Sequence, residues 1–254
     1  MPAILIPEIL PAVTILQFLV GKARPFGPQG EPSAIAKRQV MVPLQLTLLG
    51  LGGDEQGDSL HHGGPDKALH HYPADHYPRW REDLPQVAAD HWKAGAFGEN
   101  LAPTGLTEAR VCIGDIFRLG PALIQLSQIR QPCWKLNVRL GVPDMAQRVQ
   151  DQTRTGWYYR VLEPGEVTPG VELHLIDRPH PDWSLTRLAY HLYTDTLNRD
   201  ALQALASLPP LAPSLRQLAA KRLATGAVED WSRRLWHSSH GETVMGESDR
   251  MRKS

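Results

Sequence analysis

The sequence predicts a mainly β fold with helical insertions, followed by a small helical unit. Between residues 13 and 177, short apolar runs alternate with glycine and proline, a texture typical of barrels and sandwiches. Beyond the proline-bearing stretch 178–184, apolar residues recur at helical spacing. With 42% hydrophobic residues in a chain of 254, there is enough apolar surface for a real core, and wholesale disorder is excluded.

The expected strands rest on a period of two residues. In residues 44–49, Leu44 and Leu46 alternate with Gln45 and Thr47, which is typical of half-buried strands. The expected strands are residues 13–20, 44–49, 68–72, 116–119, 122–127, 158–162 and 171–176. Helical insertions are expected at residues 74–84 and 143–152.

The C-terminal part predicts three short helices. Ser184 is suited to cap a helix that carries Leu185, Leu188 and Leu192. Further helices fit residues 199–208 and 214–223, and a last amphipathic turn contains Trp231. The predicted division is a β domain at residues 1–180, a three-helix domain at 181–237 and a disordered polar tail at 238–254.

Composition argues against several classes of protein. Acidic and basic residues balance at 27 each, whereas a sequence-independent nucleic-acid binder carries a basic surplus. The apolar residues 4–20 are interrupted by Pro7, Glu8 and Pro11, so they make neither a signal peptide nor a membrane span. We therefore expect a cytoplasmic protein without a nucleic-acid or membrane partner.

A glycine-rich loop at residues 61–72 is the first candidate site. The adjacent Gly63 and Gly64 allow backbone N–H groups to converge on an anion, and Lys67 adds a positive charge. Such a loop suits a phosphate or a polyanionic cofactor, although an ordinary Gly-Pro-Asp turn explains the same residues equally well. A zinc site is less favoured, because His70 and His71 are adjacent and face opposite sides of a strand.

The two cysteines differ in their surroundings, and they are too few for a disulfide framework. Cys112 lies between β-branched residues, which indicates packing. Cys133 follows a proline, with Arg130 and Lys135 nearby in sequence. Neighbouring cations favour the thiolate, which binds soft metals or attacks electrophiles. Cys133 is therefore the candidate ligand or nucleophile, although composition does not name its metal.

Several short motifs occur along the chain in a fixed order. They are PSAIAK at residues 32–37, GDEQ at 53–56, HGGPDK at 62–67, FGENL at 97–101, SxxRxPC at 127–133, GWY at 156–158 and EDWSRRLW at 229–236. In this order they resemble the MOSC domain, a family named after the C-terminal domain of molybdenum cofactor sulfurase, and in particular its YiiM-like group. The resemblance covers roughly residues 13–236.

The resemblance implies a fold, a cofactor and an activity. The fold is a MOSC-type β-barrel with helical insertions, followed by a small three-helix C-terminal domain. The cofactor is the molybdenum cofactor (Mo-molybdopterin), with Cys133 as the protein ligand to the metal. The activity is reduction of N-hydroxylated compounds such as hydroxylamino purine base analogues. Candidate contacts to the cofactor are Lys37, His62, Gly63, Gly64, Asp66, Lys67, Asn100, Ser127 and Arg130.

Proton and electron supply follow from the same interpretation. Glu99, or a nearby histidine, is the candidate proton relay, although a simple turn also explains the FGENL motif. No Rossmann or flavin motif is recognised in the sequence, so a separate NAD(P)H-linked flavoprotein is the expected electron donor. The family suggests a homodimer, without an interface signature. The alternatives are a non-catalytic carrier of cofactor or sulfur, with a persulfide on Cys133, and a zinc hydrolase that uses the histidines.

Overall fold

The computed structural model describes residues 12–57 and 63–236. The predicted tail at 238–254 and the candidate ligand His62 lie outside the described residues. Within those ranges, no helix is long and apolar enough to cross a membrane.

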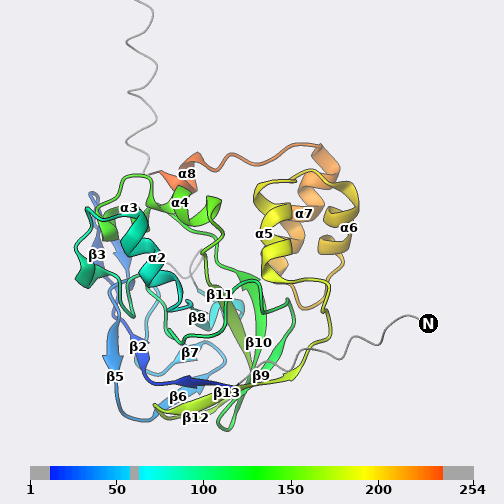
Figure 1. Ribbon diagram of the computed structural model, residues 1–254. Helices are drawn as coiled ribbons and strands as arrows, with labels where there is room; N and C mark the ends of the chain where they lie inside the picture. Colours follow the sequence, from blue (N-terminus) through cyan, green and yellow to red (C-terminus); the bar gives the residue numbers. More distant parts are fainter. Residues whose placement is uncertain (1–11, 58–62, 237–254) are drawn as a thin grey trace, which may run out of the picture.

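A curled antiparallel sheet forms the larger part of the molecule (Figure 1). Its strand order is β1 (Val13–Ile15), β13 (Val171–Asp177), β9 (Ile116–Leu119), β10 (Ala122–Ile129), β11 (Trp157–Glu163) and β8 (Leu69–His71). The smaller sheets are β12 (Gly165–Val167), β6 (Leu44–Thr47) and β7 (Gly50–Leu51), then β2 (Phe18–Val20) with β5 (Arg38–Val40), and β3 (Arg24–Phe26) with β4 (Glu31–Ser33). This half-barrel confirms the predicted fold class.

The long strand β10 shows how the sequence builds the barrel. Ala122, Ile124 and Leu126 alternate with less buried neighbours and face the core. The pairing with β11 then shifts register between Leu126 and Gln128, which makes Ser127 the extra residue of a β-bulge. The Ser127 hydroxyl donates to the carbonyl of Tyr158 (3.0 Å). Beyond the bulge the strand is buried up to its end, where the cysteine loop begins.

The helical insertions pack around a second, aromatic-rich core. They are α2 (His76–Asp83), α3 (Lys135–Leu140) and α4 (Met145–Asp151), with 3-10 turns η1 (Pro65–Lys67) and η2 (Ala89–His91). Tyr72 stacks on Phe97 at 3.9 Å between ring centroids, with Trp80 and Leu136 in the same cluster. The sequence predicts α2 and α4 but misses α3, which has only six residues.

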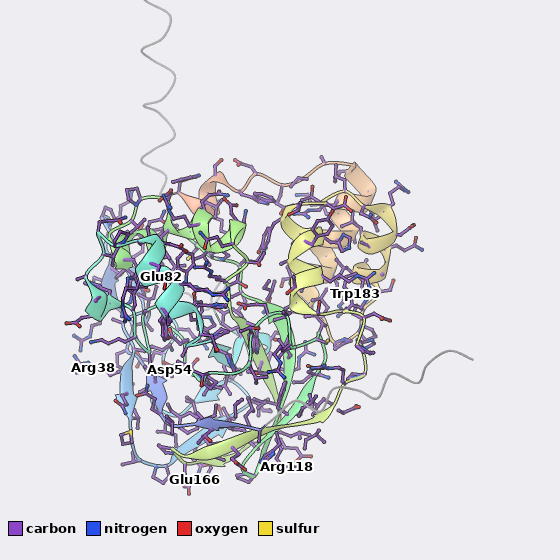
Figure 2. All side chains as sticks on the ribbon, in the orientation of Figure 1. Arg38, Asp54, Glu82, Arg118, Glu166 and Trp183 are labelled. Atoms are coloured by element: carbon purple, nitrogen blue, oxygen red, sulfur yellow. The ribbon has the colours of Figure 1, made fainter. Side chains whose placement is uncertain are left out.

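The C-terminal helices pack on the sheet and share one buried hydrophobic cluster with it. They are α5 (Leu185–Tyr193), α6 (Arg199–Ala206), α7 (Pro213–Thr225) and α8 (Ser232–Leu235). The Ser184 hydroxyl accepts the N–H of Arg187 (3.2 Å), which confirms the predicted cap. Leu185 and Leu188 belong to the same buried cluster as Phe117 of the sheet. In Figure 2, Trp183 lies at the end of the helical domain that faces the sheet, just before α5.

One predicted strand is wrong in its extent. Residues 13–20 form two strands, because β1 pairs with β13 while β2 pairs with β5. Leu16, between them, is 73% exposed. The continuous apolar run therefore spans two sheets, and its period does not reveal the break.

Candidate functional site

One pocket brings five of the predicted site residues together with further charged side chains. It encloses about 620 Å³, a volume that includes the solvent at its open mouth. Its walls come from residues 33–37 and 54–57, from residues 97–100, and from the ends of β8, β10 and β11. The lining residues include Lys37, Asp54, Glu55, Lys67, His70, Asn100, Arg130, Cys133, Lys135 and Tyr158.

Cys133 lines this pocket from the loop between β10 and α3. Its side chain is half-buried and is not in a disulfide. The N–H of Leu136 donates to the Cys133 carbonyl (3.0 Å), which fixes the backbone of Cys133 just before α3. By contrast, Cys112 is 4% exposed, and burial together with the charge of Asp115 raises the pKa of its thiol to about 11. The structure thus separates the two thiols as the sequence predicts.

Two buried side chains in the pocket carry polar atoms without a partner. Arg130 is 6% exposed and His70 is 4% exposed. Among the described residues, neither Arg130 Nη1 nor His70 Nε2 has a hydrogen-bond partner. Burial first, and then the charge of Arg130, hold the pKa of His70 well below its usual value. A buried polar atom left without a partner is costly, so Arg130 and His70 are candidate contacts for a ligand in this pocket.

Asp54 organises the part of the pocket wall that contains Lys37. Its carboxylate accepts the N–H of Gly21 (2.7 Å) and binds Lys37 Nζ through both oxygens. The side chains of Lys37 and Asp54 are each 8% exposed. Burial lowers the pKa of Lys37, and the adjacent Asp54 opposes that effect. Figure 2 shows Asp54 beside the strands β2 and β5.

The charges in the pocket favour an anion. Lys37, Lys67, Arg130 and Lys135 bring four positive charges, against two negative charges on Asp54 and Glu55. Asp54 is already paired with Lys37, and Glu55 is paired with the exposed Lys22 (2.8 Å). Lys135 Nζ donates to the Pro32 carbonyl (2.9 Å), a neutral group that does not offset the charge of the lysine. The lining residues therefore carry a formal basic surplus, and two of the basic residues, Arg130 and Lys135, are close to Cys133 in sequence.

The predicted site residues divide into two groups. Cys133, Lys37, Lys67, Asn100 and Arg130 line the pocket together. Gly63, Gly64, Asp66, Ser127 and Glu99 are not among its lining residues. Asp66 instead forms an ion pair with Arg160 (2.6 Å), and its carbonyl accepts the Ser127 hydroxyl (2.6 Å). These contacts tie η1 to the sheet and place Lys67 at the pocket.

Glu99 supports the pocket wall from behind. Its fully buried carboxylate accepts the N–H groups of Gly95 (2.6 Å) and Phe97 (2.9 Å) and the hydroxyl of Tyr77. Burial raises the pKa of Glu99, although these hydrogen bonds oppose that effect. The carboxylate thus shapes the turn that presents Phe97 and Gly98 to the pocket. Its predicted part in proton transfer stays a prediction.

His70 and Tyr158 are pocket residues that the sequence did not single out for this site. His70 is paired with Tyr158 across β8 and β11, with ring centroids 4.9 Å apart. His71 faces the other side and stacks on Trp157 at 4.1 Å, as strand alternation predicts. The close approach of β8 and β11 requires Gly156, because a Cβ there would lie 2.3 Å from the His71 carbonyl oxygen. The GWY motif was the available signal for Tyr158.

A histidine metal centre finds no support in the part of the chain that the structure describes. No three His, Cys, Asp or Glu side chains converge there in a way that could hold a metal ion. His61 and His62 lie outside that part, so the zinc interpretation is untested at those positions.

Comparison with known proteins decides the family. Residues 58–174 match the model of the MOSC domain, and residues 183–226 match that of the YiiM-like 3-alpha helix domain. Protein YiiM of Escherichia coli (strain K12) is 46% identical over 209 residues, which cover 82% of this chain and 92% of that protein. The chain belongs to the MOSC family, in its YiiM-like group.

A solved structure and a longer protein are also similar to this MOSC protein. The crystal structure of YiiM from Escherichia coli superposes with a TM-score of 0.73 at 39% identity, and the match covers 87% of this chain and 98% of that one. A protein named "Reductase" from Gibberella moniliformis is 37% identical over 197 residues, which cover 77% of this chain and 35% of that protein. The MOSC fold is thus shared, and one longer relative has a name that denotes redox chemistry.

Proposed function

We propose that this MOSC protein is a molybdenum-cofactor-dependent reductase of N-hydroxylated compounds, with the Cys133 thiolate as the protein ligand to molybdenum. The observation that carries the proposal is the pocket that Cys133 shares with Arg130 and Lys67. MOSC domains are associated in general with binding of the molybdenum cofactor. The family and the pocket chemistry therefore support the same assignment.

The residues of the pocket fit that cofactor. Its phosphate and dithiolene groups are anionic, and the unpartnered Nη1 of Arg130 is a buried donor suited to such a group. Lys67 and Lys135 would add positive charge, and Asn100 would complete the wall. The Cys133 thiolate is a soft ligand for a metal already bound by sulfur. Arg130, Lys67 and Cys133 are thus the residues that would hold the group.

The proposed reaction balances as R–NHOH + 2 e⁻ + 2 H⁺ → R–NH₂ + H₂O. The bound cofactor would supply the two-electron redox chemistry, and the protein would bind and orient both reactants. His70 is held neutral by its low pKa, so its ring would carry one N–H donor and one acceptor nitrogen. His70 lines the pocket, and we propose that its ring hydrogen-bonds the N–OH group or transfers a proton. Glu99, whose carboxylate lies behind the pocket wall, remains the second candidate for proton transfer.

Electrons would come from a partner protein. We propose a separate NAD(P)H-linked flavoprotein as the donor, since no dinucleotide-binding motif is recognised in this sequence. The pocket is open on one side, which would allow substrate and solvent protons to enter. A cytoplasmic setting would provide both the donor and reduced thiols.

The test is analysis and assay of protein purified from a host that makes the cofactor. We expect stoichiometric molybdenum and pterin, and reduction of a hydroxylamino purine with an artificial electron donor. Cys133→Ser should abolish turnover while the protein stays folded, and Cys112→Ser should leave turnover nearly unchanged. Sulfane sulfur on Cys133 without molybdenum would instead establish the carrier function, and stoichiometric zinc would establish a hydrolase. Either result overturns the reductase.

A further inference from the structure

The short helix α8 lies beside the loop that carries Cys133. The N–H of Trp134 donates to the Arg234 carbonyl (2.8 Å), and Arg234 Nη1 donates to the Pro132 carbonyl (2.6 Å). These two bonds bind the residues directly before and after Cys133. Figure 1 shows α8 next to α3 and α4, at the end of a long connection from α7. A segment about a hundred residues away in sequence thus braces both sides of the thiol.

The guanidinium of Arg234 is itself anchored. Arg234 Nη2 donates to Gln150 Oε1 on α4 (2.6 Å). On the neighbouring turn, Asn137 Nδ2 donates to the Leu235 carbonyl (2.9 Å). Arg234 therefore links the cysteine loop to α4 through a rigid planar fork, while Asn137 links α3 to the end of α8.

The connection that leads to α8 is fixed to the three-helix domain. Arg222 is 2% exposed and donates to both carboxylate oxygens of Glu229, at 2.9 and 2.7 Å. Trp231 Nε1 donates to the same carboxylate (2.8 Å), and its ring meets Tyr193 edge-on at 5.9 Å. Arg222 also donates to the Leu192 carbonyl at the end of α5 (3.0 Å). The path from the helical domain to Cys133 therefore consists of specific polar contacts.

We propose that Arg234 is a positioning residue for Cys133, through which the three-helix domain fixes the place of the thiol in the pocket. A metal ligand has to be placed within about 0.5 Å by its surroundings, and a loop without such braces samples several conformations. The proposal rests on the proposed function only for the identity of the group that the Cys133 thiol binds. The order of the loop is a property of the protein itself.

The test uses cofactor-free protein with Cys112→Ser, so that Cys133 is the one thiol. A nitroxide label is attached to Cys133, and its electron paramagnetic resonance spectrum is compared among variants. Arg234→Ala should add a mobile component to the spectrum and should speed alkylation of unlabelled Cys133 by iodoacetamide about threefold or more. Arg233→Ala is the matched control, because Arg233 is an exposed residue on the same helix. It should match the parent protein in both measurements.

Two further variants separate positioning from a general loss of structure. Arg234→Lys keeps the charge and one donor, and should restore part of the label's immobility. Glu229→Gln should loosen the label less than Arg234→Ala, since it acts through the connection. Thermal unfolding shows whether each variant is folded. If Arg234→Ala does not fold, Arg234→Lys is compared with Arg233→Ala instead. Equal label mobility and equal alkylation rates in Arg234 and Arg233 variants would overturn the proposal. Because no cofactor is used, that result would leave the reductase assignment unchanged. The reductase assignment is tested separately, by the metal analysis and the turnover assay.

Discussion

The side-chain amide of Asn100 donates a hydrogen bond of 2.8 Å to the carboxylate of Asp54. The same amide donates to the Leu19 carbonyl (2.9 Å), and its oxygen accepts the N–H of His70 (2.9 Å). Asn100 thus joins β2, β8 and the Asp54–Lys37 pair into one pocket wall. Asn100 and Asp54 therefore hold the wall in place through hydrogen bonds within the protein.

Removal of the charge on Asp54 should be costly. Asp54→Asn would leave the buried ammonium of Lys37 without its counter-ion, and we expect the free energy of unfolding to fall by about 3 kcal/mol. Urea unfolding measures the change. Glu55→Gln is the matched control, because Glu55 pairs with Lys22 at an exposed position, and it should lose far less. Equal losses in the two variants would show that the burial of the Asp54–Lys37 pair has no energetic consequence.

Alkylation should distinguish the two thiols in the folded protein. Near neutral pH we expect iodoacetamide to modify Cys133, because its side chain lines the open pocket. Cys112 should react only when the protein unfolds, since it is buried and its thiol has a pKa of about 11. Peptide mapping by mass spectrometry identifies the modified residue. Comparable rates at Cys112 in the folded protein would contradict the burial described above.

Arg130 should be needed for retention of the cofactor. Arg130→Gln removes a charge-assisted donor, and we expect cofactor binding to weaken about tenfold. The readout is the molybdenum content of protein purified from a host that makes the cofactor. Arg118→Gln is the control, since Arg118 is an exposed residue on β9. A molybdenum content in Arg130→Gln equal to that of Arg118→Gln would remove Arg130 from the binding site.

Glu99 should matter for stability whether or not it transfers protons. Glu99→Gln replaces one acceptor oxygen by an NH₂ group that faces backbone donors, and should cost roughly 1–3 kcal/mol. Tyr77→Phe removes one hydrogen bond to Glu99 and should cost less. Chemical denaturation measures both. A pH profile of turnover in Glu99→Gln then tests the proton relay separately, because a purely structural carboxylate would leave the shape of that profile unchanged.

The Arg222–Glu229 pair should give a pH-dependent contribution to stability. Burial alone would raise the pKa of Glu229, but hydrogen bonds from Arg222 and Trp231 lower it to about 2, from 4.5. A carboxyl whose pKa is lowered by folding stabilises the folded state at pH values above its pKa in the unfolded chain. That contribution is lost as the pH falls toward its pKa in the folded protein. Glu229→Gln should therefore reduce the free energy of unfolding by roughly 1–2 kcal/mol near neutral pH, after allowance for the exposed part of the side chain. The difference from wild type should shrink below about pH 4.5. A constant difference down to pH 3 would contradict the shift.

The site was predictable in part. The residues that line the pocket at Lys37, Lys67, Asn100, Arg130 and Cys133 lie in recognisable motifs, so the resemblance to the MOSC family located them. Glu99 lies in one of those motifs as well, yet its carboxylate supports a turn behind the wall. A motif marks a position that the fold uses, but it does not say which way the side chain points.

By itself, the sequence determined the class of fold, the longer strands, the helix cap at Ser184 and the contrast in burial between the two thiols. Each of these depends on near neighbours in the chain, through strand alternation, capping and local charge. Tertiary structure alone decided that residues 13–20 divide between two sheets, that sheet and helices share one core, and that Arg234 bonds to Pro132 across 102 residues of sequence. Such contacts join residues with no local pattern in common, and only closure of the whole chain brings them within bonding distance.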